Sequence, residues 1–263
     1  MKQLLARTDA HEGPVYVASE RALYFTTQRT GRRVDIMRLS LADGRISTVL
    51  ADAAAANGMA LDRDGRLLVC EQQPAAISRV DPATGERQTI VDAYRGRPLN
   101  SPNDVVVKSD GSIWFTDPSY AHLQGFGPEA QLGDHVYTYD DTLELAADGF
   151  EKPNGLAFSP DESVLYVGDS EARVIDAFDV VHGRMLANRR RFAAIGRGYP
   201  DGLKTDRRGN VYTTGGAGLL VFSPAGALLR EIDLPGAVNF AFAVDRLLVT
   251  ADDAIWSIPL QGA

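Results

Sequence analysis

The chain has 263 residues, of which 44% are hydrophobic and 24% are charged, proportions typical of a globular protein with a substantial core. Its formal net charge of −8 at pH 7 argues against a nucleic-acid partner, because binding to phosphates requires a basic surface. No stretch approaches the ~18 consecutive apolar residues of a membrane span, so no membrane association is expected.

The first residues and the single cysteine bear on where the protein resides. Residues 1–13, MKQLLARTDAHEG, contain too short an apolar stretch for a secretory signal. Cys70 is the only cysteine and lies in an apolar run, so we expect a buried thiol in a reducing compartment. These features predict a cytoplasmic protein.

Six segments of the chain share one pattern. Each opens with Glu, Asn or Asp, continues through an apolar run to a tight turn, and returns along a second apolar run, which is typical of paired β-strands. The opening residues, which lie 38 to 51 positions apart, are Glu12, Asn57, Asn103, Asn154, Asp201 and Asn239. A repeat of about 45 residues with four short strands indicates a β-propeller, and six repeats predict six blades.

The last repeat is shorter than the others. After Asn239 there is room for only three strands, at residues 239–244, 246–251 and 254–259. We expect residues 2–7 to supply the missing outer strand, which would close the ring and remove an exposed sheet edge. The prediction is therefore an all-β, six-bladed β-propeller closed by an N-terminal strand, with residues 1–263 forming one domain.

The six opening residues are candidate metal ligands. The first strand of each propeller blade lines the central channel, so these residues should form a ring of two carboxylates and four amides at its mouth. Such oxygen donors suit hard cations such as Ca²⁺, Mg²⁺ or Mn²⁺, and without a cation Glu12 and Asp201 would repel each other. Asn-Gly and Asp-Gly are also common turn dipeptides, so Asn57, Asn154 and Asp201, taken singly, favour turns, and it is the recurrence at six equivalent positions that favours a ring of ligands.

A second set of polar residues is expected at the same end, where the second strands return. It comprises Thr27, Glu71, Asp117, Asp169, Thr214 and Asp252. The following link in the third repeat, residues 119–133, is unusually long, as many binding loops are. From these features, and from the ring itself, the candidate substrate contacts are Asn57, Glu71, Asp169, Tyr120 and His122.

Several stretches resemble one known family. Residues 99–120, LNSPNDVVVKSDGSIWFTDPSY, resemble the gluconolactonase signature over their whole length. EGPVY, NGMALDRDGRLLVCE, KPNGLAFSPDESVLYVGDS and YPDGLKTDRRGNVY also match the pattern of the gluconolactonase and senescence-marker protein (regucalcin) family. The resemblance extends roughly from Glu12 to Ile258. It differs from the usual pattern at Tyr16 and at 119–121, positions that bear on sugar specificity more than on the metal.

The resemblance implies a six-bladed propeller that holds one divalent cation, usually Ca²⁺ and sometimes Zn²⁺ or another ion such as Mg²⁺ or Mn²⁺. Carried over by motif, its ligands are Glu12, Asn103, Asn154 and Asp201. The implied activity is hydrolysis of a small-molecule sugar lactone, in which the cation polarises the carbonyl group and water attacks it.

Asp201 is the candidate general base, and Asp104, next to Asn103, is an alternative catalytic carboxylate. Asp104 equally suits a role in orienting that amide or capping a turn, and Asp169 is a further alternative base. The pattern also allows an esterase or phosphotriesterase of the same fold, a natural-product lactonase, or a non-catalytic calcium-binding propeller. We expect a monomer or a weak homo-oligomer.

Overall fold

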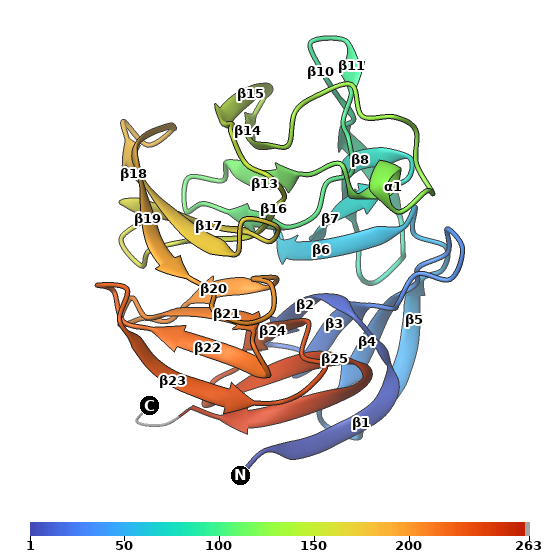
Figure 1. Cartoon of the computed structure of the whole chain (residues 1–263). Helices are drawn as coiled ribbons and strands as arrows, with labels where there is room; N and C mark the ends of the chain where they lie inside the picture. The colour runs from blue at the N-terminus through green and yellow to red at the C-terminus, as the bar shows by residue number, and fades with distance from the viewer. Residues whose placement is uncertain (261–263) are drawn as a thin grey trace.

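The computed structural model describes residues 1–260 and consists almost entirely of β-strands. Six of the sheets are arranged as blades about a common centre (Figure 1). The first two blades are β2 (Glu12–Val17), β3 (Ala22–Thr26), β4 (Ile36–Ser40) and β5 (Ile46–Leu50), then β6 (Ala56–Leu61), β7 (Leu67–Gln72), β8 (Ala75–Val80) and β9 (Arg87–Val91).

The next three blades have the same antiparallel order. They are β12 (Val105–Val107), β13 (Ile113–Asp117), β14 (His135–Asp140) and β15 (Thr142–Ala147); β16 (Pro153–Phe158), β17 (Val164–Asp169), β18 (Val174–Val181) and β19 (Met185–Ala194); and β20 (Leu203–Thr205), β21 (Val211–Gly215), β22 (Gly218–Phe222) and β23 (Leu228–Asp233). The six-bladed propeller predicted from the repeat is therefore confirmed.

The sixth blade joins the two ends of the described chain. It contains β24 (Asn239–Phe242), β25 (Arg246–Pro259) and β1 (Gln3–Ala10), and β1 pairs with β25 from Gln3 opposite Ser257 to Ala10 opposite Asp252. The strand β25 doubles back, because Asp252 has a positive φ and the N–H of Leu260 donates to the Asp245 carbonyl at 2.9 Å. Its two arms are the two strands expected at 246–251 and 254–259, and β1 is the expected fourth strand.

The core consists of six apolar clusters within the described residues, each between two neighbouring blades. Successive side chains of a strand point to opposite faces, so one strand serves two clusters. In β7, Val69 packs against blade one while Leu68 and Cys70 pack against blade three. The inner strands contact one another in the cyclic order β2, β6, β12, β16, β20, β24 and back to β2.

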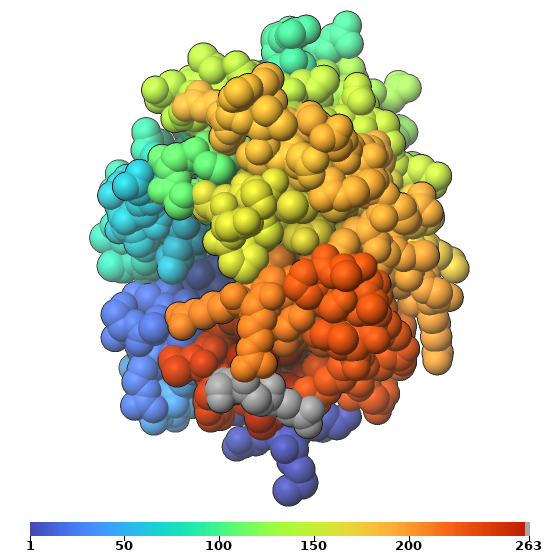
Figure 2. Space-filling model, turned by 90° about the vertical axis from the view of Figure 1, so that its left-hand side faces the viewer, coloured from blue at the N-terminus to red at the C-terminus, as the bar shows by residue number. Residues whose placement is uncertain are grey.

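Aspartates stabilise the hairpin turns between first and second strands at one end of the propeller. Asp62 Oδ1 accepts the backbone N–H groups of Asp64 and Arg66, both at 2.9 Å. In Figure 2, segments coloured from blue through yellow to orange-red meet around a hollow on this end. The inner strands line a cavity of about 430 Å³ there, with apolar residues such as Val15 and Leu156 in its walls.

Two short elements depart from the regular blade pattern. The strands β10 (Ala93–Tyr94) and β11 (Arg97–Pro98) form a small hairpin before blade three. The single-turn helix α1 (Tyr120–Leu123) lies in the long link of that blade. Within residues 1–260, no helix has the length and apolar character required to cross a membrane.

Candidate metal and active site

The propeller brings the opening residues of its six repeats to one end. They lie near the starts of the inner strands: first in β2 and β24 (Glu12, Asn239), second in β6 and β16 (Asn57, Asn154), and two residues before β12 and β20 (Asn103, Asp201). All of them except Asn239 line one cavity of about 470 Å³. The four residues predicted to bind a metal are therefore neighbours of a single cavity.

Close approach of the inner strands explains the glycines that follow several opening residues. A Cβ on Gly58 would lie 2.5 Å from the carbonyl oxygen of Asn103, and one on Gly155 would lie 2.2 Å from that of Asp201. Both glycines donate their N–H to those same oxygens, at 2.8 and 3.2 Å. These Asn-Gly pairs belong to strands β6 and β16 and not to turns, so the turn interpretation is wrong: glycine is needed because a side chain would clash.

Two carboxylates face each other in this ring. Glu12 Oε2 accepts the N–H of Gly13 at 2.9 Å and Nδ2 of Asn239 at 2.8 Å. Burial raises the pKa of Asp201 well above its ordinary value, and the charge of Glu12 and a hydrogen bond to it raise that pKa further. The neighbours that shift this pKa most are the carboxylates of Glu12 and Asp104, which raise it, and the amide of Asn154, which lowers it.

Asn154 lies between this carboxylate pair and the long link of blade three. Its Nδ2 donates to Ser170 Oγ at 3.1 Å, and Ser170 Oγ donates to the carbonyl oxygen of Pro200 at 2.7 Å. Asn154 also hydrogen-bonds Asp201 and the hydroxyl of Tyr120. Burial raises the pKa of Tyr120 to about 12, opposed by its hydrogen bond to Ser170. Tyr120 therefore reaches from α1 to the ring.

Asp104 occupies the position that glycine takes in neighbouring repeats. Its carboxylate is buried; Oδ1 accepts the N–H of Val105 at 2.9 Å, whereas Oδ2 has no hydrogen-bond partner. Burial raises the pKa of Asp104 to about 7, while the charge of Lys204 opposes the shift and that of Glu12 adds to it. Asp104 does not line the cavity, a position that suits the expected role in orienting the Asn103 amide.

The donor set suits a divalent cation. Asn57 Oδ1, like Asp104 Oδ2, is buried without a partner, and a buried oxygen without a donor is an unfavourable arrangement that a cation can relieve. Among residues 1–260 no group of three or more His, Cys, Asp or Glu side chains is placed to hold a metal. A cation at this end must therefore take amide oxygens together with carboxylates, a combination that Ca²⁺ accepts readily.

Comparison with known proteins identifies the family. Residues 10–252 match the family model described as the SMP-30/gluconolactonase/LRE-like region. The chain belongs to this family. The resemblance inferred from the sequence motifs is thus confirmed.

Similar members of the family carry lactonase names. A gluconolactonase from Zymomonas mobilis is 32% identical over 84% of this chain and 68% of its own length. The lactonohydrolase oryL from Aspergillus oryzae is 29% identical over 96% of this chain and 66% of its own length, so the chain spans about two thirds of these two relatives. A solved gluconolactonase from Xanthomonas campestris has a TM-score of 0.91 and 36% identity, covering 98% of this chain and 89% of that one.

In the present chain, the cavity around the opening residues is also lined by residues that the sequence analysis did not select. His11 lines it, with Nδ1 2.7 Å from Asp252 Oδ1. Arg29 and Tyr199 add a guanidinium and a phenol to its walls. The position of His11 directly before Glu12 was the one available signal, whereas nothing in the repeat singles out Arg29 or Tyr199.

Three candidate substrate contacts need correction. Glu71 is fully buried and binds Arg87 through both carboxylate oxygens, with Ser78 Oγ donating to Oε2 at 2.7 Å. Asp169 accepts the backbone N–H groups of residues 151 and 152 at 2.8 and 2.9 Å. His122 is exposed, and none of these three lines the cavity. Their polar groups serve the scaffold or face solvent, whereas the other two candidates, Asn57 and Tyr120, do line the cavity.

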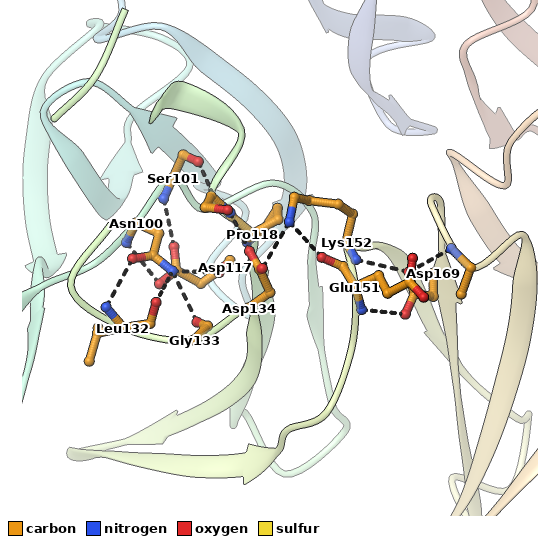
Figure 3. Close-up of polar contacts among 12 residues, drawn as sticks. Asn100, Ser101, Asp117, Pro118, Leu132, Gly133, Asp134, Glu151, Lys152 and Asp169 are labelled. Atoms are coloured by element: carbon orange, nitrogen blue, oxygen red, sulfur yellow. Dashed lines mark hydrogen bonds and ion pairs between the residues drawn. The ribbon is translucent and has the colours of Figure 1, made fainter. Parts of the chain in front are cut away.

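A polar network fixes both ends of the long link of blade three (Figure 3). At its start, Asp134 Oδ1 accepts the N–H of Ser119 at 2.5 Å; at its end, Asn100 Nδ2 donates to the carbonyl of Gly133 at 3.0 Å. Asp134 Oδ2 also accepts a hydrogen bond from Lys152 Nζ at 2.9 Å, which ties this link to blade four just before Asn154. The network holds Tyr120 in a defined position over the ring.

Proposed function

We propose that this chain hydrolyses the cyclic ester of a sugar acid with the help of one divalent cation. The lactonase names of relatives at 32 and 36% identity support this activity. The observation that carries the proposal is the pairing of the Glu12 and Asp201 carboxylates in the lining of one cavity. A divalent cation would relieve the repulsion between these two carboxylates.

The residues that would hold the cation are Glu12, Asn103, Asn154 and Asp201. Ca²⁺ is the expected ion, with Zn²⁺, Mg²⁺ or Mn²⁺ as alternatives. When bound, the cation would supply Lewis acidity that polarises the ester carbonyl.

The chain's own residues would then bind the lactone and manage its protons. Asn57 and Tyr120 line the cavity and would hydrogen-bond the hydroxyl groups of the sugar. A water molecule in the cavity would attack the carbonyl carbon while Asp201 accepts its proton; the bond from the carbonyl carbon to the ring oxygen then breaks, and Asp201 returns the proton to that oxygen, which leaves as a hydroxyl group. Asp104, buried beside Asn103, would act by positioning the ring of opening residues around the cation and not by touching the substrate.

The experiment that tests this function is hydrolysis of D-glucono-1,5-lactone followed by pH-stat. We expect turnover that is lost after chelation and restored by Ca²⁺ or another divalent ion, and lost in Asn154→Ala. Absence of turnover on a panel of lactones, aryl esters and phosphotriesters, together with Ca²⁺ binding, would instead support a non-catalytic calcium-binding propeller. Turnover of the esters or phosphotriesters alone would support a different hydrolase on this fold.

A further inference from the structure

Among the described residues that line the cavity, one is a Lys or Arg: Arg29, in the link between β3 and β4 of blade one. The carboxylates that line the same cavity are Glu12, Asp201 and Glu171. His11 also lines it, and its Nδ1 is hydrogen-bonded to Asp252, which does not line the cavity. A guanidinium in such a place is either neutralised by a carboxylate or available to an anion.

The contacts of Arg29 are all with neutral groups. Nη1 donates to the carbonyl of Gly31 at 2.5 Å, and Nη2 donates to Gln124 Oε1 at 3.2 Å. Its Cζ lies 3.8 Å from the centroid of the Phe126 ring. These contacts fix the plane of the guanidinium and use only part of its five N–H donors, so its positive charge stays uncompensated. By contrast, Arg33 in the same link binds both oxygens of Asp35.

The charges of the cavity walls are arranged asymmetrically. Blades one and four lie opposite each other in the cyclic order of six inner strands. Arg29 therefore lies across the cavity from Glu171, which follows β17 in blade four. Apart from the proposed cation, a negative group of a ligand finds a positive charge on the Arg29 side, because Arg29 is the Lys or Arg side chain among the described residues of this lining.

We propose that Arg29 binds an anionic group of the substrate, so that the preferred substrates are lactones of sugar acids bearing a second acidic group. This inference rests on the proposed lactonase function and names its substrate class. A planar guanidinium held by stacking pairs with a carboxylate, sulfonate or phosphate through two parallel hydrogen bonds and loses little side-chain entropy in doing so. Arg29 is thereby a specificity-determining residue at the wall of the cavity, away from the ester carbonyl.

The test compares kcat/KM for three lactones: neutral D-glucono-1,5-lactone, D-glucaro-1,4-lactone with a carboxylate, and 6-phospho-D-glucono-1,5-lactone with a phosphate. We expect the wild-type enzyme to prefer at least one charged lactone over the neutral one. Arg29→Gln should lower the ratio of charged to neutral kcat/KM by about 10- to 100-fold, the range for losing a hydrogen-bonded charge pair, mainly through KM. Arg29→Lys should recover part of the ratio. The two charged lactones distinguish carboxylate from phosphate recognition.

Two matched variants separate charge recognition from a structural role of Arg29. Glu171→Gln removes a charge from the opposite wall, and Arg33→Gln removes a guanidinium of the same link that is paired with Asp35 and does not line the cavity; neither should lower the ratio. A ratio that Arg29→Gln leaves unchanged, or a wild-type preference for the neutral lactone, overturns the inference while leaving the lactonase proposal intact. If no lactone is hydrolysed, binding of D-glucarate and D-gluconate is compared by calorimetry, and equal affinities for both also overturn it.

Discussion

Two sets of carboxylates lie at the same end of the propeller and have opposite surroundings. On the second strands, Asp117 and Asp169 are buried, and each accepts two backbone N–H groups from the segment that leads into the neighbouring inner strand. At the inner strands, Glu12 and Asp201 face each other, and the charge of Glu12 raises the pKa of Asp201. The two sets have the same kind of side chain and similar burial, so the number of hydrogen-bond donors around each carboxylate decides which set is structural.

The geometry of a blade explains this difference. The chain passes each second strand on its way into the inner strand, so its backbone N–H groups are within reach of a carboxylate there. At the axis the inner strands contact each other so closely that Gly58 and Gly155 leave no room for a side chain. Carboxylates that converge there meet other carboxylates and amides, which leaves a place for a cation.

The largest effect is expected from Asp201→Asn, which tests the functional role of the carboxylates at the inner strands. We expect kcat/KM for a sugar lactone to fall by at least about 10³-fold, within the range for loss of a general base, as measured by pH-stat. The same change should raise the melting temperature of the chelator-treated protein, because it removes repulsion with Glu12. Asp161→Asn, in an exposed turn at the opposite end, is the matched control and should keep full activity. Retained activity in Asp201→Asn would contradict the site.

The opposite result is expected for the second-strand set. Asp169→Ala leaves two partly buried N–H groups without an acceptor and should lower the free energy of unfolding by about 3 kcal/mol. Because Asp169 does not line the cavity, kcat/KM per folded molecule should change little. Urea unfolding and activity of the same samples check this, and unchanged stability with lost activity would reverse the assignment.

A smaller change is expected from crowding the inner ring. Gly155→Ala places a Cβ against the Asp201 carbonyl, which should reduce stability by about 2 kcal/mol through overpacking and displace Asp201. Gly196→Ala is the control, since no atom lies within 4 Å of its added Cβ. Equal stability of the two variants would show that close approach at the axis is not what requires glycine.

The sequence pattern predicted the blades but not all of their side-chain partners. The repeat and the three-strand remainder after Asn239 determined the number of blades and the closure by β1, because strand periodicity and chain length are visible in one dimension. The roles of Glu71 and Asp169 were predicted wrongly, because Arg87 and the backbone of residues 151–152 become their partners only when the sheet and the preceding loop are in place.

The glycines that follow the opening residues also depend on contacts between blades, which the sequence pattern does not reveal. Asn-Gly is compatible with a tight turn and with a crowded strand, and only contact between β6 and β12 distinguishes the two. The contact of Arg29 with Phe126 joins residues of blades one and three and has no signature in the repeat.

The smallest expected effect concerns pH. The pKa of Asp104 is raised to about 7 by burial, whereas in an unfolded chain it is about 4. An acid with a raised pKa contributes stability below its unfolded pKa and loses that contribution as pH rises toward its folded pKa. In metal-free protein, stability relative to Asp104→Asn should therefore fall by about 1 kcal/mol between about pH 5.5 and pH 6.5. A constant difference across that interval would contradict the raised pKa.

The central claim is that Glu12, Asn103, Asn154 and Asp201 share one cation. Calorimetric titration of the chelator-treated protein with Ca²⁺, repeated with Mg²⁺, Mn²⁺ and Zn²⁺, tests it most directly. At least one of these ions should bind with a stoichiometry of one per chain, and that binding should be lost in Glu12→Gln and in Asp201→Asn. Absence of binding for all four ions, or binding that both variants retain unchanged, would contradict the claim.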